Sequence, residues 1–144
     1  MFSNFSFWIW GLVIAQFLSA FFHSLSFIAK PKPKNETEKQ LIELASGYKA
    51  DMGGGIKRSF SQLFIGVSTC FTMIYTMGAA INWYFLRTSI RPEVWEGLLL
   101  IELLAYGILF LLMIKFTFWP PIIVTGLVFI FTSCKNLQKR INNG

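Results

Sequence analysis

The sequence predicts an all-α fold, namely a transmembrane four-helix bundle with a short amphipathic interfacial helix in the first loop. Of the 144 residues, 54% are hydrophobic and only 14% are charged, against roughly 25% charged residues in a soluble domain. Uncharged runs in the chain are long enough to cross a bilayer, which takes about 20 apolar residues. The cations gather between these runs, as in loops that face anionic headgroups. These observations exclude a water-soluble protein and predict a single membrane domain over residues 1–144.

The first two predicted spans are residues 7–29 and 59–86, neither of which contains Asp, Glu, Lys or Arg. The first would form about 35 Å of helix, which is one full crossing. Its apolar run is longer than that of a signal peptide, so we expect this helix to be retained. The second run lies between Arg58 and Arg87, and it is long enough to span with some tilt.

The third and fourth predicted spans are residues 93–114 and 120–137. Pro92 precedes the third span, since proline is tolerated at the first position of a helix. Prolines at the start of residues 120–137 end one helix and begin the next. The fourth uncharged run is short, so we expect it to continue to residue 137 while Lys139 and Arg140 extend to the interface.

Residues 30–58 form the predicted cytoplasmic loop. Together with Lys115 they place eight of the 13 Lys and Arg residues on one side of a four-span chain. Because the first span is followed by three lysines and preceded by none, the positive-inside rule puts this loop in the cytoplasm and both termini outside it. Within the loop, Asn35 and Glu38 predict the start of an amphipathic surface helix that ends near Gly47.

Two predicted spans carry a stripe of small and polar residues within an arc of about 100°. In the first span the stripe comprises Ala15, Gln16, Ser19, His23 and Ser26. In the second it comprises Arg58, Gln62, Gly66, Thr69, Met73, Thr76 and Ala80. Small residues let helices approach closely, so we predict that Ser19 and Gly66 face other helices. The alternative is that the stripes line a polar pocket.

Glu102 is the strongest candidate for a functional residue, because it is an acid inside a predicted span. A carboxylate at that depth is costly and normally faces the bundle interior or a cavity. It then needs a hydrogen-bond donor or must be neutral. The candidate partners are His23, Arg58, Gln62 and Tyr106. If the stripes line a pocket, the predicted ligand-binding residues are Gln16, His23, Arg58, Gln62, Glu102 and Tyr106.

Three glycines at 53–55 precede Lys57 and Arg58. Cations beside the start of a helix favour the binding of an anionic lipid headgroup. Lys57 and Arg58 are therefore the predicted headgroup-binding residues. The alternative is a flexible hinge followed by membrane-anchoring cations. The spacing does not match a nucleotide-binding P-loop.

The composition predicts no metal and no cofactor, because the chain has one histidine and neither cysteine lies at ligand spacing from it. Cys70 and Cys134 lie in apolar surroundings and are expected to be inert. No basic run is interleaved with aromatics as in a nucleic-acid-binding module. The predicted partners are therefore membrane lipid and other membrane subunits or a second copy of the chain, and not nucleic acid.

Three short motifs resemble a family of small bacterial four-span integral membrane proteins of unknown function. They are Phe22-His23-Ser24, the glycine-rich stretch leading into Arg58-Ser59, and Phe118-Trp119-Pro120-Pro121. The resemblance implies a multi-pass protein of the bacterial inner membrane. In this family a second histidine often follows the first by four residues, where this chain has Phe27.

The leading functional prediction is a small integral membrane protein that acts as an accessory subunit or scaffold and binds lipid or a hydrophobic ligand between its helices. The alternative is a membrane enzyme acting on a lipophilic substrate, with His23 and Glu102 as catalytic proton-transfer groups. The two predictions differ in whether His23, Arg58 and Glu102 meet in one cavity.

Overall fold

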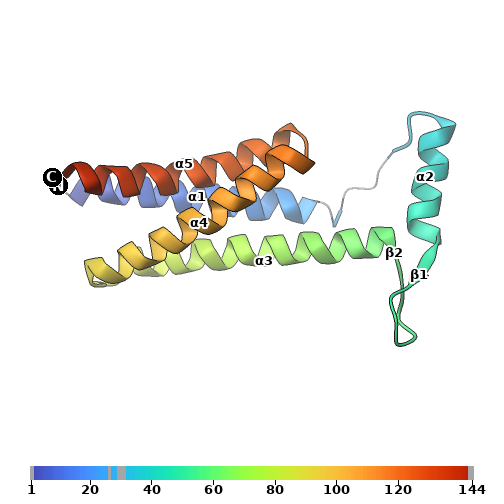
Figure 1. Cartoon of the computed structure of the whole chain (residues 1–144), viewed down its shortest axis with the longest axis horizontal. Coiled ribbons are helices and arrows are strands. Elements are labelled where there is room, and N and C mark those ends of the chain that lie inside the picture. The colour runs from blue at the N-terminus through green and yellow to red at the C-terminus, as the bar shows by residue number, and fades with distance from the viewer. Residues whose placement is uncertain (1, 26, 29–31, 143–144) are drawn as a thin grey trace. The chain divides into compact units, whose positions relative to one another are not determined.

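A computed structural model describes residues 2–25, 27–28 and 32–142, with side chains from 6 to 134 within these ranges. Its helices are α1 (Phe2–Leu25), α2 (Glu36–Gly47), α3 (Phe60–Arg87), α4 (Pro92–Phe116) and α5 (Trp119–Asn142), and its strands are β1 (Lys49–Asp51) and β2 (Lys57–Ser59) (Figure 1). The all-α class is confirmed, with one small unpredicted sheet in the first loop. The predicted stripe residue Ser26, loop residue Lys30 and the side chains of Lys139 and Arg140 lie outside what is described.

Three helices of the described chain are long and apolar enough to cross a membrane: Ser6–Leu25 within α1, then α3 and α4. A shorter apolar helix, Trp119–Cys134, lies within α5. Large apolar side chains remain exposed along the long helices, for example 72% of Phe64 and 66% each of Ile101 and Leu111. Water-exposed apolar surface on this scale is unusual for a soluble protein. The helices are therefore those expected of a membrane protein.

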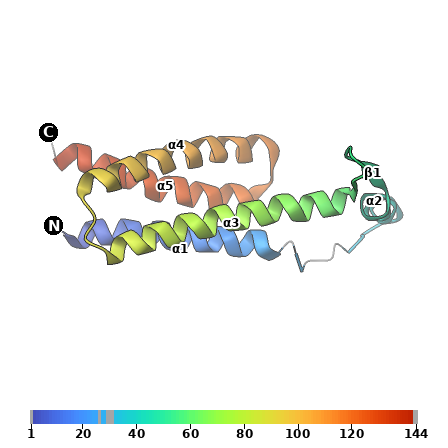
Figure 2. The same cartoon turned by 90° about the horizontal axis from the view of Figure 1, so that it is seen from below.

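The chain forms two compact units, the first comprising Met1–Ala20 and Ile74–Gly144 and the second Phe21–Met73. In the first unit, α4 and α5 lie side by side and run in opposite directions (Figure 2). The rings of Phe110 and Phe129 stack between them with centroids 5.7 Å apart. Each ring lies against a glycine of the opposite helix, Phe110 on Gly126 and Phe129 on Gly107. Small residues thus let these helices approach closely, as in other membrane helix pairs.

The second unit contains the hairpin of β1 and β2, which pair antiparallel with Lys49 opposite Ser59 and Asp51 opposite Lys57. The turn is made by Gly53, Gly54 and Gly55, whose φ angles are +92°, +62° and +79°. Residues with a Cβ rarely adopt this left-handed conformation, so the turn requires the three glycines. The segment considered as a flexible hinge is the tip of a hairpin.

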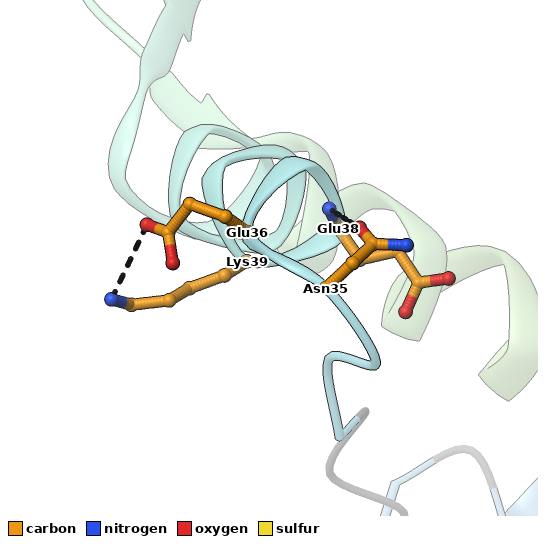
Figure 3. A network of polar contacts seen from close by, with 4 residues as sticks. All are labelled: Asn35, Glu36, Glu38 and Lys39. Carbon is orange, nitrogen blue, oxygen red and sulfur yellow. Dashed lines mark hydrogen bonds and ion pairs between the residues drawn. The ribbon is translucent and has the colours of Figure 1, made fainter.

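Helix α2 matches the predicted amphipathic helix at both ends. The Asn35 side chain accepts a hydrogen bond from the Glu38 backbone N–H at 2.8 Å, as a helix N-cap should. The Glu38 carboxylate accepts from the Lys34 N–H at 2.6 Å, one residue before the N–H that a standard capping box uses. Figure 3 shows this cap beside the 3.4 Å ion pair of Lys39 with Glu36.

Candidate functional site

Four buried polar side chains from three helices meet in the first unit. This polar cluster comprises Gln16 of α1, Asn82 of α3, and Glu102 and Tyr106 of α4. Gln16 and Asn82 are fully buried, and Glu102 and Tyr106 are only 7% and 6% exposed. The cluster is the main concentration of buried polar groups that connects separate helices in the described chain.

Side-chain amides donate the four hydrogen bonds that join the members of the cluster. Asn82 Nδ2 donates to Glu102 Oε1 at 2.8 Å and to Gln16 Oε1 at 3.1 Å. Gln16 Nε2 donates to Glu102 Oε1 at 3.3 Å and to the Tyr106 hydroxyl at 3.1 Å. Glu102 Oε1 therefore accepts from two helices at once, which ties α1 and α3 to α4.

The helical repeat explains why these residues share one interior face. The buried residues of α4 are Trp95, Leu99, Glu102 and Tyr106, and those of α3 are Tyr75, Gly78, Ala79 and Asn82. Each set recurs at intervals of three or four residues, apart from the adjacent Gly78 and Ala79, which places its members on one side of a helix. The rings of Tyr75 and Tyr106 stack with centroids 5.6 Å apart.

Gly78 makes room for the cluster. A Cβ at this position would lie 2.7 Å from the Tyr106 hydroxyl and 2.9 Å from Gln16 Nε2. Both distances are shorter than normal contacts, so any side chain here must displace the hydrogen-bonded groups. The cluster depends on this glycine as much as on its polar members.

Two acceptor atoms of the cluster are buried and receive no hydrogen bond from the part of the chain that the structure describes. They are Glu102 Oε2 and Asn82 Oδ1. A buried polar atom without a partner costs about 1–3 kcal/mol. The arrangement can therefore accept hydrogen bonds from a donor that the described residues do not supply.

The remaining predicted site residues lie in the second unit, where each has its own surroundings. The His23 ring stacks on Phe71, with centroids 5.0 Å apart. Lys57 and Arg58 lie exposed on β2, and Arg58 Nη1 donates to the Lys57 carbonyl at 3.1 Å. The donors on Glu102 are the amides of the first unit, so a shared site of Glu102 with His23 or Arg58 stays a prediction.

Gln62 has a structural role that the sequence-based prediction missed. Its Oε1 accepts from the Ser59 backbone N–H at 3.0 Å, and the Gln62 N–H donates to Ser59 Oγ at 3.3 Å. This reciprocal pair is a capping box at the start of α3. The spacing Ser-x-x-Gln, directly before a long apolar run, is the pattern that predicts it.

The stripe predicted for the first span is confirmed at three of its residues, while His23 is half-buried, and the stripe predicted for the second span is mostly exposed. Ala15, Gln16 and Ser19 are buried. Gly66 is exposed, and a Cβ added to it would have nothing within 4 Å, so nothing described in its own unit supports the predicted close approach there. The interior residue that was missed is Asn82, which lies about 200° around the helix from Gln62 at 100° per residue. An amide inside an apolar run, four residues after a glycine, was the available indication.

No described group of three His, Cys, Asp or Glu side chains is arranged to hold a metal ion. Cys70 and Cys134 are free thiols. Comparisons with protein families, with curated proteins and with solved structures find no match to this chain. The family resemblance of its short motifs therefore stays a prediction.

Proposed function

We propose that the chain is a four-span integral membrane protein, a scaffold or accessory subunit, that binds a lipophilic molecule at the polar cluster. The observation that carries this proposal is the pair of buried acceptors, Glu102 Oε2 and Asn82 Oδ1, without a donor among the described groups. The matching ligand has a hydrogen-bond-donating head, such as a hydroxyl or an amine, and an apolar tail.

The membrane interior explains why such a ligand would gain binding energy at this place. Hydrocarbon supplies no hydrogen-bond donors. A buried acceptor of the polar cluster therefore forms a hydrogen bond only when a bound molecule brings a donor. Ile101 and Leu104 are 66% and 60% exposed on the outer side of α4, which faces away from Glu102, and the apolar tail would lie along this outer side of the helix. The head and tail of one amphiphile would then have separate, matching surroundings.

Four spans are supported by the backbone of α5, which has 24 residues and is about 36 Å long at 1.5 Å per residue. Its described apolar part packs against α4 and against α1, where the Phe131 ring contacts Gly11. Such contacts between apolar helices favour the bundle predicted from the sequence. The alternative, an enzyme that uses His23 and Glu102, is kept as the second proposal, because both amides that contact Glu102 donate to Oε1 and leave Oε2 without a donor among the described groups.

Identification of the molecules that copurify with the protein tests this proposal. The wild-type chain, Glu102→Gln and Thr125→Val would be purified in mild detergent, weighed by native mass spectrometry and extracted for lipid identification. Thr125 is the matched control, because its buried hydroxyl donates within its own helix at 2.7 Å. We expect wild type and Thr125→Val to retain one amphiphile per chain.

Glu102→Gln should lose that molecule, because an amide N–H replaces the Oε2 acceptor and cannot accept a hydrogen bond from the donor head of the ligand. Wild-type protein with no bound molecule would contradict the proposal. Equal retention by Glu102→Gln would contradict it as well, since the ligand would then be held elsewhere.

A further inference from the structure

Exposed apolar side chains occur in the second unit outside the apolar helices. Leu41, Leu44 and Tyr48 are 64%, 62% and 61% exposed. They are spaced three and four residues apart, with Leu41 and Leu44 inside α2 and Tyr48 at its C-terminal cap, and together form one stripe, which we call the interfacial stripe. In the hairpin turn, Met52 and Ile56 are 48% and 54% exposed. This apolar surface has no cover within the part of the unit that the structure describes.

A different side of α2 contacts other elements of the second unit. The Ser61 hydroxyl of α3 donates to the Ala45 carbonyl at 3.2 Å, and α2 also contacts β2. These contacts hold α2 at the beginning of α3, where it crosses the end of that helix instead of continuing along it (Figure 1). The interfacial stripe therefore has a fixed place at the end of a helix that is long and apolar enough to span a membrane.

The strands beside α2 carry exposed cations. Lys49, Lys57 and Arg58 are exposed on the hairpin. The acid among them is Asp51, which stands opposite Lys57 and also accepts from the Gly53 N–H at 2.8 Å. The hairpin thus has an excess of positive charge beside exposed apolar side chains, a combination that favours anionic lipid surfaces.

We propose that the interfacial stripe and the hairpin cations bind the surface of an anionic bilayer, the same bilayer that α3 crosses. The stripe enters the boundary between headgroups and acyl chains, while Lys49, Lys57 and Arg58 contact lipid phosphates. Continuity with the apolar helix α3 favours lipid over a protein partner, because the Ser61 contact fixes the stripe where that helix would leave the membrane. This inference rests on α3 spanning the membrane and does not depend on a ligand at the polar cluster.

Site-directed labelling of the full chain in vesicles tests this surface. In a background with Cys70→Ser and Cys134→Ser, single cysteines at Leu41, Leu44 and Glu43 would carry a fluorescent label. Glu43 is the matched control, because it is exposed on the polar side of the same helix. Quenching by brominated lipid and by aqueous iodide would be compared in phosphatidylcholine vesicles and in vesicles of equal parts phosphatidylcholine and phosphatidylglycerol.

We expect labels at Leu41 and Leu44 to be quenched by brominated lipid and protected from iodide, most strongly in the anionic vesicles. The label at Glu43 should stay accessible to iodide. Lys57→Gln combined with Arg58→Gln should remove the difference between the two vesicle types, because the phosphate contacts are lost. Protease protection of the α3 region in the same vesicles reports separately whether the chain has inserted.

Equal iodide accessibility at positions 41, 43 and 44 in an inserted chain would overturn the proposal. Protection that rises with the protein-to-lipid ratio would overturn it too, since it would assign the stripe to a second copy of the chain. Lipid quenching that is unaffected by the Lys57 and Arg58 substitutions would contradict the contribution of the cations.

Discussion

The two halves of α3 have similar compositions but different surroundings. Both are apolar and both contain glycine, small residues and a side-chain amide. In the carboxyl-terminal half, Tyr75, Gly78, Ala79 and Asn82 are buried in the first unit. In the amino-terminal half, Gly66 is exposed and Gln62 caps the helix start.

This difference shows that small residues alone do not identify a packed face. At Gly78 the missing side chain is matched by two specific groups, the Tyr106 hydroxyl and the Gln16 amide. At Gly66 nothing lies within 4 Å of a Cβ. A glycine indicates helix packing when polar or aromatic side chains of the facing helices occupy the volume that a side chain at the glycine position would fill.

The largest effect is expected from leucine at the two glycines. Gly78→Leu should lower the free energy of unfolding by about 3 kcal/mol or more, because it overpacks the interior and displaces two hydrogen-bonded groups. Gly66→Leu should leave stability unchanged or raise it by up to about 1 kcal/mol, through better helix propensity. Thermal unfolding in detergent measures both, and equal destabilisation would place Gly66 in the interior.

The next largest effect is expected from the amide of Asn82. Asn82→Leu keeps the side-chain size but removes the donor to Glu102 and Gln16, at a cost of about 1–3 kcal/mol. Thr69→Val is the control in the exposed half, since its hydroxyl donates within α3 at 2.8 Å, and we expect a change below about 0.5 kcal/mol. Unfolding in detergent compares the two variants. A stabilised Asn82→Leu would argue that the cluster costs the fold more than it contributes.

Loss of the capping box should have a smaller and local effect. Ser59→Ala removes the N-cap hydroxyl of α3 and should cost about 1 kcal/mol, with faster amide exchange in the first turn of that helix. Gln62→Glu keeps an acceptor for the Ser59 N–H and should retain slow exchange. Hydrogen exchange followed by mass spectrometry reports this region directly, and fast exchange in both variants would contradict the assigned cap.

The smallest effect is expected from the ion pair on α2. Lys39 and Glu36 are 3.4 Å apart with side chains that are 52% and 70% exposed. Solvent screening limits such pairs to roughly 0.5 kcal/mol or less. Lys39→Gln should therefore leave thermal unfolding unchanged, and a clear loss of stability would mean that this part of α2 is covered in the folded protein.

The sequence predicted the long helices, the capped α2 and the burial of Glu102, because uncharged runs, capping residues and the cost of a membrane carboxylate are strong local constraints. It placed Gln16 on a polar stripe and named Tyr106 as a candidate partner of Glu102, whereas the donors to Glu102 are Gln16 and Asn82. It did not predict Asn82, because the rotation of α3 about its axis depends on which helices it meets. The hairpin was missed because three-residue strands are too short to show alternation, and Gly53–Gly55 is equally typical of a hinge.

A double-mutant cycle between Asn82 and Glu102 tests the central claim most directly, namely that the interior of the first unit is organised by hydrogen bonds on Glu102. Unfolding free energies would be measured for Asn82→Leu, Glu102→Leu and the double variant, with Thr125→Val replacing Asn82→Leu in a reference cycle. The account predicts a coupling of about 1 kcal/mol or more between Asn82 and Glu102 and additivity in the reference cycle. Additivity of Asn82 and Glu102 within about 0.3 kcal/mol would contradict it.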